Sequence, residues 1–314
     1  MTPEKQSSVL AAALVAMFMT GLAIGGGVRA LAVSPGGANA YTNRLGFDTY
    51  NAPSVAEMQY SWNNYAYFYI GIYIAGANAP SQPNLTPQNT TGFNWVSSVN
   101  DIGFGFVPID VDLQAPPGCE VGSQALQGQP GAYARMSPNP STAYNQGVQG
   151  AVTAAANART LGFTGAAPVY DDMEAYLTSN TACHTAVLEF LHGWLTQMKT
   201  YEGKVAGVYG SSAGSDVQSW ASISPPPDDV WFAEWNAGDE TSPNISVWAT
   251  SYIQNTSWSA QPPYGRLHQF RGDIPNIWFG DVYKSIDQTC AWGIVAGTGY
   301  GPDSRYPNCP GTHP

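Results

Sequence analysis

Short apolar runs alternate with segments of helical character along most of this chain, and this alternation restricts the folds available to it. Eight runs have the length and bounds of β-strands: 44–48, 67–74, 103–109, 167–173, 204–209, 230–235, 266–270 and 282–287. Helices are indicated at 54–62, 90–100, 143–161 and 181–201. Strands separated by helices are typical of a parallel sheet.

The count of eight strands predicts an α/β fold of the TIM type, a (β/α)8 barrel in which the last strands can be irregular. An open, doubly wound sheet is the alternative, because periodicity does not show whether the two edges of a sheet join. The last helical segment has the clearest helical spacing, carried by Val187, Leu188, Leu191, Leu195 and Met198.

The first forty residues differ from the rest. Lys5 precedes an apolar run from Val9 to Ile24, and small residues follow, which is the pattern of an export signal. Two small-x-small sites, Ala30-Leu31-Ala32 and Ala38-Asn39-Ala40, fit cleavage; an uncleaved membrane anchor is the alternative. We expect a leader over residues 1–40, a barrel over 41–290, a disulfide-tethered tail over 291–314, and a secreted protein.

The four cysteines agree with export, because even numbers of cysteines in secreted chains pair as disulfides. We favour Cys119 with Cys183, which each follow a predicted strand end, and Cys290 with Cys309, which bracket a tail rich in glycine and proline. A zinc site is disfavoured, since no Cys-x-x-Cys spacing occurs.

The charge balance excludes one class of partner. Acids outnumber bases 22 to 11, giving a net charge of −11, which argues against a nucleic-acid ligand. The sequence has neither His-Glu-x-x-His spacing nor a phosphate-binding loop or dinucleotide motif, so we expect no metal and no cofactor.

Acidic residues stand at several predicted strand ends. Asp172 and Glu174 close the fourth strand two residues apart, so they share one face, whereas Asp171 should point away. At the usual strand rise their α-carbons lie about 6.6 Å apart, and flexible side chains bring the carboxyls into the range used in glycoside hydrolysis. The structural alternative for this pair is a helix cap or a site that binds arginine.

In a barrel the carboxyl ends of the strands meet at one mouth. The other residues expected near that mouth are Asp48, Asp110, Asp112, Glu234, Trp235 and Asp287. Clustered acids raise each other's pKa, which can keep one proton on a general acid near neutral pH. Trp235 offers a flat face for a sugar ring, while Glu234 fits a salt bridge at the rim equally well.

Six pieces of sequence, in order across residues 44–290, carry a family resemblance. They are Gly46-Phe47-Asp48-Thr49 with Ala52-Pro53-Ser54, Ile70-Gly71-Ile72-Tyr73-Ile74, Leu113-Gln114-Ala115-Pro116, Pro168-Val169-Tyr170-Asp171-Asp172-Met173-Glu174-Ala175-Tyr176, Gly207-Val208-Tyr209, and Val230-Trp231-Phe232-Ala233. With them the chain resembles the glycoside-hydrolase-like barrel of secreted actinobacterial proteins, the DUF1906 or Rv2525c-like group, which is related to the GH25 lysozymes.

The resemblance implies a barrel with an acidic pocket and a role on cell-wall or extracellular glycan. It implies that Glu174 is the proton donor and Asp172 its partner, with Asp48 and Asp287 at the ends of the first and last strands. In the lysozyme relatives the Asp-x-Glu pair serves N-acetyl sugars, whose acetamide can assist the reaction. Two positions depart from the family pattern: Asp171 replaces a residue that is usually apolar, and Tyr50 one that is often cysteine.

The leading hypothesis is a secreted glycoside hydrolase in which Glu174, Asp172, Asp48 and Asp287 are catalytic, and in which Trp235, Glu234 and Asp110 bind substrate. We expect peptidoglycan or another polysaccharide as its partner and a monomeric protein. Any contact with a membrane would come through an uncleaved leader. The alternative is an inactive glycan-binding barrel associated with the cell wall. A minor alternative is a serine hydrolase using Ser212 of Gly210-Ser211-Ser212-Ala213-Gly214, with His268 and either Asp228 or Asp239.

Overall fold

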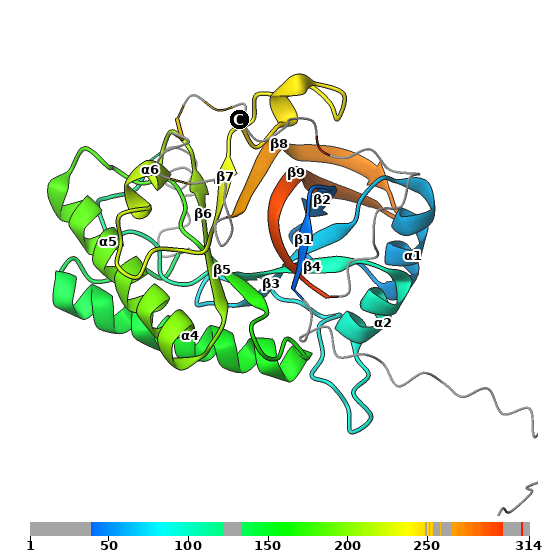
Figure 1. Cartoon of the computed structure of the whole chain (residues 1–314), viewed down its shortest axis with the longest axis horizontal. Coiled ribbons are helices and arrows are strands. Elements are labelled where there is room, and N and C mark those ends of the chain that lie inside the picture. Colours follow the sequence, from blue (N-terminus) through cyan, green and yellow to red (C-terminus); the bar gives the residue numbers. More distant parts are fainter. Residues whose placement is uncertain are drawn as a thin grey trace, which may run out of the picture. The chain divides into compact units, whose positions relative to one another are not determined.

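The computed structural model describes residues 39–121, 133–248, 250, 252–253, 258, 265–297 and 309. Within these residues, eight strands close into a barrel with helices around it (Figure 1). The barrel strands are β2 (Leu45–Asp48), β3 (Tyr69–Ala75), β4 (Gly105–Asp110), β5 (Pro168–Asp172), β6 (Val205–Ser211), β7 (Asp229–Ala233), β8 (Gly265–Trp278) and β9 (Tyr283–Ala296). A further strand, β1 (Asn39–Thr42), pairs with the far end of β9.

The eight predicted strands are all present, and the TIM-type barrel is confirmed. Strands β2 to β8 are parallel to their neighbours in chain order, and β9 closes the barrel by pairing with both β8 and β2. The open, doubly wound alternative is therefore wrong. The last strand departs from a regular (β/α)8 barrel, because β9 runs antiparallel to both neighbours and continues to Ala296, beyond the predicted end of the barrel at residue 290.

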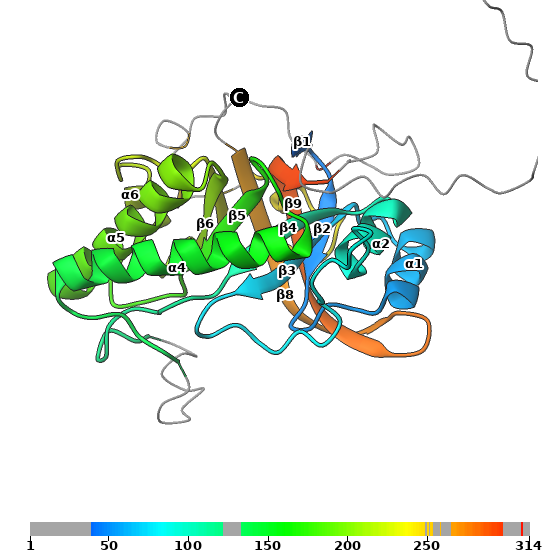
Figure 2. The ribbon, with the colours of Figure 1, turned by 90° about the horizontal axis from the view of Figure 1, so that it is seen from below.

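The four predicted helical segments are helices in the structure, and they lie outside the barrel (Figure 2). The helices are α1 (Val55–Asn64), α2 (Trp95–Ile102), α4 (Pro140–Leu161) and α5 (Thr181–Thr196), with short elements η1 (Gln197–Tyr201), α6 (Val217–Trp220) and η2 (Pro243–Ile245). The starts of α1, α2, α4 and α5 are capped by side chains: Ser54 and Glu57 form a capping box at α1, and Asn139 accepts from the Thr142 N–H at α4.

Helices α4 and α5 pack closely because glycines replace side chains where they cross. A Cβ on Gly147 would lie 2.0 Å from the Phe190 carbonyl oxygen, and one on Gly193 would lie 2.1 Å from the Tyr144 carbonyl oxygen. Either substitution would therefore push the two backbones apart. Helix α4 also contacts the sheet, where Asn157 Nδ2 donates to the Ile74 carbonyl oxygen of β3 (3.2 Å).

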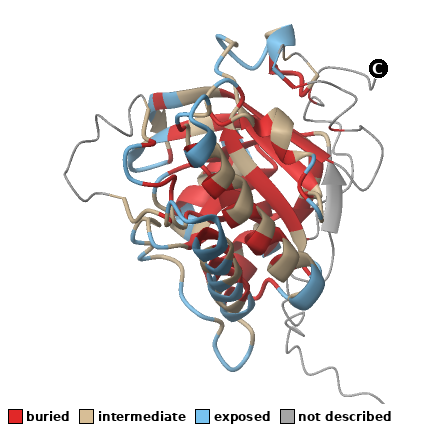
Figure 3. Cartoon of the chain, turned by 90° about the vertical axis from the view of Figure 1, so that its left-hand side faces the viewer, coloured by how far each residue is buried: buried red, intermediate tan, exposed pale blue. Residues whose placement is uncertain are grey.

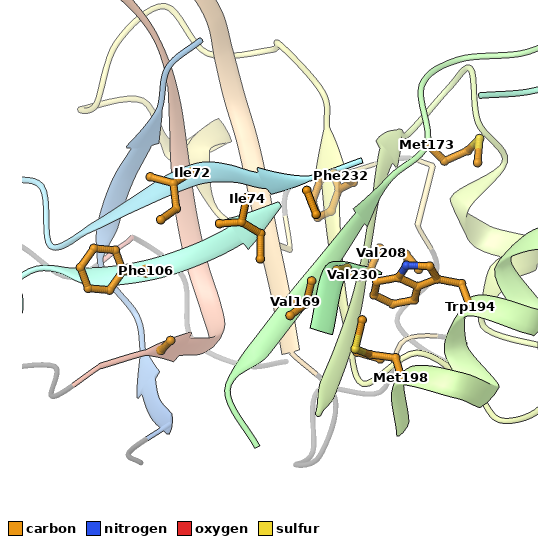
Figure 4. Close-up of a cluster of buried hydrophobic side chains, with 14 of the residues drawn as sticks. Ile72, Ile74, Phe106, Val169, Met173, Trp194, Met198, Val208, Val230 and Phe232 are labelled. Carbon is orange, nitrogen blue, oxygen red and sulfur yellow. The ribbon is translucent and has the colours of Figure 1, made fainter. Parts of the chain in front are cut away.

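The core has two layers, because successive strand residues point to opposite faces of the sheet. The inner layer fills the barrel with Tyr69, Val107, Ile109, Val111, Tyr170, Trp231, Leu267, Ala291 and Val295. The outer layer, shown in Figure 4, packs against the helices and includes Ile72, Phe106, Val169, Trp194, Val208 and Phe232. Figure 3 shows buried residues along the strands and exposed ones on the outward sides of the helices.

Both predicted disulfides are present, Cys119 with Cys183 and Cys290 with Cys309. The predicted leader falls outside the described residues except for the first two residues of β1, so it stays a prediction. In the portion of the chain that is described, no helix combines the length and the apolar character that crossing a bilayer requires.

Candidate active site

Four acids that the sequence placed at strand ends meet at one end of the barrel. Asp48 ends β2, Asp172 ends β5, Glu174 follows β5 and Asp287 lies on β9. They line two adjoining cavities of about 320 and 210 Å³, each of which includes all four acids together with Tyr73 and Asp273. None of the described residues lining either cavity is lysine or arginine.

Asp48 and Asp287 are direct neighbours across the β2–β9 ladder. Gln269 of β8 joins them, because its Nε2 donates to Asp48 Oδ2 (3.1 Å) and to Asp287 Oδ2 (3.2 Å). The Oε1 atom of Gln269 accepts from Tyr209 Oη (2.9 Å) and Trp235 Nε1 (3.1 Å). One neutral amide thus holds two carboxylates beside each other.

Asp172 and Glu174 are held through their backbone by a second buried amide. Gln114 Nε2 donates to the Asp172 carbonyl oxygen (2.7 Å), and its Oε1 accepts from the Glu174 N–H (2.9 Å). The side chains remain available for chemistry: Asp172 Oδ1 is buried with no hydrogen-bond partner among the described residues, and Glu174 is only partly buried. The Asp-x-Glu backbone is therefore fixed while its carboxyls face the cavities.

Burial raises the pKa of all four acids. For Asp48, the neighbouring charges of Asp287 and Glu174 raise the pKa further, while the hydrogen bond from Gln269 lowers it. For Asp172 the added causes are Glu174, Asp48 and Asp110, and for Glu174 the main one is Asp287. Burial raises the pKa of Asp287 to about 6. A cluster of buried acids therefore retains protons at a pH at which isolated carboxyls are ionised.

The backbone of β8 bulges where it passes the acids. The register with β9 shifts between Arg271 and Ile274, and Asp273 in this stretch has a φ of 52°, in the left-handed region that Asp tolerates better than most residues. The bulge directs the Asp273 N–H at Asp287 Oδ1 (2.7 Å). It thereby gives Asp287 a backbone donor and places Asp273 in the wall of both cavities.

Two exposed aromatic side chains border the mouth. Trp235 is 56% exposed and lines the smaller cavity, and Tyr50 is 71% exposed and lines the larger one. Trp235 lies flat against β8 because the facing residue is glycine: a Cβ on Gly272 would be 1.9 Å from its ring. Fixed aromatic faces beside a polar cavity suit the apolar face of a sugar ring.

Other residues that the sequence assigned to the mouth lie elsewhere. Asp110 points to the outer face of the sheet, where its Oδ2 accepts from Trp194 Nε1 (2.9 Å), because the alternation along β4 turns Ile109 inward instead. Glu234 lies just beyond β7, lines neither cavity and accepts from Asn236 Nδ2 (3.2 Å). Asp171 points away from Asp172, as the strand pattern predicted, and Asp112 lies on the outer side with Asp110.

The serine-hydrolase arrangement is not formed. His268 is fully buried, and its two ring nitrogens face the carbonyl oxygens of Glu234 (2.9 Å) and Ser246 (3.1 Å). Neither nitrogen is left to accept a proton from Ser212. Asp228 pairs with Lys199 (2.6 Å).

The sequence reasoning missed four residues of the site: Tyr73, Tyr209, Gln269 and Asp273. Gln269 and Tyr209 carried a usable signal, because each lies in a predicted strand at a position that alternation turns inward. Gln114 belongs to a motif of the family resemblance, but the motif alone does not predict its hydrogen bonds to the backbone of Asp172 and Glu174. Among the described residues no group of three or more His, Cys, Asp or Glu side chains is arranged to hold a metal ion.

Comparison with known proteins gives a family match. The family model described as Rv2525c-like, glycoside hydrolase-like domain matches residues 60–291. No curated protein matches the chain.

Several solved structures are similar at low identity. An uncharacterized protein of B. stearothermophilus has a TM-score of 0.48 at 14% identity, covering 79% of this chain and 95% of that one. The catalytic domain of endolysin ply40 from bacteriophage P40 of Listeria monocytogenes has a TM-score of 0.44 at 14% identity, covering 81% and 94%. A family 25 glycosyl hydrolase from Bacillus anthracis has a TM-score of 0.41 at 12% identity, covering 84% and 93%. Since the family match spans most of the chain and includes the barrel strands β3 to β8 with the greater part of β9, this protein belongs to the Rv2525c-like family of glycoside hydrolase-like domains.

Proposed function

We propose that this protein is a secreted glycosidase that hydrolyses glycosidic bonds in peptidoglycan or another extracellular polysaccharide. The observation that carries the proposal is the convergence of Asp48, Asp172, Glu174 and Asp287 in one open mouth, whose described lining includes no lysine or arginine. Export is supported by the leader pattern of residues 1–40 and by the two disulfides, which form in oxidising compartments.

Glu174 is the proton donor in this proposal. It is partly exposed, whereas Asp48 and Asp172 are buried, and burial together with Asp287 raises its pKa, so it can hold a proton and deliver it to the leaving oxygen. Asp172 shares its strand face and stabilises the positive charge that develops on the sugar. Asp48 and Asp287, held together by Gln269, add negative potential on the other side of the cavity.

Sugar rings would stack on Trp235 and Tyr50, which border the two cavities. The same aromatic faces favour a second candidate function, a glycan-binding barrel without turnover, because stacking does not depend on the acids.

The test of the proposal is the release of reducing ends from peptidoglycan and other wall glycans by the purified protein. Glu174→Gln and Asp172→Asn remove the acids with little change of shape, and each should slow release by about 10²- to 10⁴-fold. Glu189→Gln, on the outer helix α5, is the matched control and should leave the rate unchanged. If the wild type binds glycan but releases no reducing ends, the glycosidase proposal is wrong and the glycan-binding barrel is supported. If it shows no binding and no release, both proposals are wrong.

A further inference from the structure

A second cavity lies on the outer side of the barrel, between the sheet and helix α4. Its volume is about 740 Å³, within the range of small-molecule sites, and it shares no lining residue with the two cavities at the mouth. One wall comes from the end of β3 and the segment after it, and the opposite wall is the polar edge of α4, which includes Asn145 and Gln149. The cavity is therefore separate from the proposed glycosidase site.

Two carboxyls line this cavity without a charged partner. Asp110 is 1% exposed; its Oδ2 accepts from Trp194 Nε1 (2.9 Å), while Oδ1 has no hydrogen-bond partner among the described residues. Asp112 is partly buried, and its Oδ1 accepts from the Ala77 N–H (3.3 Å). Its other oxygen lies against α4, where a Cβ on Gly150 would be only 2.0 Å away.

A third acid stands behind these two. Asp171 is the neighbour of Asp110 across the β4–β5 ladder, is 1% exposed, and has no partner for either carboxyl oxygen among the described residues. None of the ion pairs formed by the described residues includes any of the three acids, and no lysine or arginine lines the cavity. Buried carboxyls are rarely left without a partner in folded proteins, because the loss of hydration is costly.

The chemistry of the walls indicates what could supply the missing partner. A metal ion does not fit, because the described residues hold no suitable group of three or more ligands. The lining is instead divided: carboxyls at one side, and apolar surface from Ile74, Ala75 and Leu113 beside them. An ammonium group on a hydrocarbon stem matches both parts, since the cation meets the carboxyls and the stem meets the apolar surface.

We propose that this outer cavity is a second binding site and that it takes a small amphipathic amine. The ammonium group donates to the partly exposed Asp112 beside the buried Asp110, and the hydrocarbon part lies against Ile74 and Leu113. Burial raises the pKa of Asp110, with Asp112 adding to the rise, and a bound ammonium group would act in the opposite direction. This site does not depend on the proposed glycosidase activity.

The test is isothermal titration calorimetry of the full chain with hexylammonium chloride, with 1-hexanol as the neutral compound of equal length. We expect saturable binding at one site, with hexanol binding at least about tenfold more weakly, because a charge-assisted hydrogen bond is lost.

Two substitutions test whether the amine binds at the outer cavity. Asp112→Asn and Asp110→Asn should each weaken hexylammonium binding at least about tenfold. Asp112 is partly exposed, so its variant serves as the test if Asp110→Asn does not fold. Glu174→Gln at the mouth should bind the amine as the wild type does. Equal binding of hexanol, retained affinity in Asp112→Asn, or loss in Glu174→Gln would overturn the proposal.

Discussion

Gln269 shows how a single uncharged residue can organise a group of acids. Its carbonyl oxygen accepts from Tyr209 and Trp235, which are donors there, so its amide group must face Asp48 and Asp287. An arginine in this place would bind the same two carboxylates but would lower their pKa strongly. The amide holds them in position while burial keeps their pKa raised.

Gln269→Leu removes all four hydrogen bonds at once. We expect it to lower kcat by about ten- to a hundredfold, since a lost buried hydrogen bond costs about 1 to 3 kcal/mol, and to raise KM because Trp235 loses its anchor. Gln269→Glu should instead shift the pH profile, because it adds a carboxyl beside Asp48 and Asp287. Kinetics over pH measure both effects, with exposed Gln59→Leu as control. Unchanged profiles in both variants would show that Gln269 does not position the acids.

The positions of Asp172 and Glu174 could be predicted because alternate strand residues share a face. The same rule predicted that Asp171 turns away. Alternation could also predict that Gln269 points inward, but the hydrogen-bond partners of Gln269 and Gln114 could not be predicted, since an amide in a strand or loop gives no sign of which groups it will meet. Asp110 was assigned to the wrong face, because the exact residue at which a strand ends decides which side chains reach the mouth.

Strand β9 accounts for the main difference between the expected barrel and the observed one. Hydrophobic alternation indicates that a strand is present but carries no information on its direction, so the antiparallel course of β9 could not be predicted. The reversal explains how Asp287 reaches the mouth: it lies near the start of its strand, whereas Asp48 ends its own. The two carboxyls lie side by side because the two residues are direct partners in the β2–β9 ladder, so their side chains point to the same face of the sheet.

The segment after β4 is a second element on which the site depends. It carries Gln114 and is tied to the loop after β5 by the Leu177 N–H, which donates to the Cys119 carbonyl oxygen (2.8 Å), and by the disulfide of Cys119 with Cys183 at the start of α5. This disulfide therefore anchors the loop that supports Asp172 and Glu174.

Replacing both Cys119 and Cys183 by serine should lower stability and slow the reaction. The two cysteines are 64 residues apart against 19 for Cys290 and Cys309, so loop entropy predicts a loss about 1 kcal/mol larger than in the corresponding variant of the second pair. Urea unfolding measures the difference. Activity should fall further in the first variant, since only that disulfide supports Gln114; equal activity in the two would contradict this role.

The molecule as a whole combines a net charge of −11 with buried acids on both faces of its sheet. Their folded-state pKa values are raised above those of the unfolded chain, so the native protein holds more protons than the unfolded one. The free energy of unfolding should therefore fall as pH rises from about 4 through and beyond 6, the pKa to which burial raises Asp287.

Thermal unfolding at pH 5 and pH 7.5 tests this expectation, and the melting temperature should be higher at pH 5. Asp287→Asn should reduce the difference between the two, because it removes one of the titrating groups. Glycosidase activity should also decline toward alkaline pH as Glu174 loses its proton. A melting temperature that rises with pH would contradict the assignment of raised pKa values.

The closure of the barrel by β9 also sets the order in which the site can be assembled. Asp48 belongs to the first barrel strand and Asp287 to the last, and the hydrogen bond from Gln269 to Asp48 spans 221 positions of the chain. Contacts of such long range form late in folding. A chain that is still being synthesised therefore contains Asp48, Asp172 and Glu174 before Gln269 and Asp287 have been added. The complete acidic mouth exists only after the C-terminal hairpin of β8 and β9 has docked against β2.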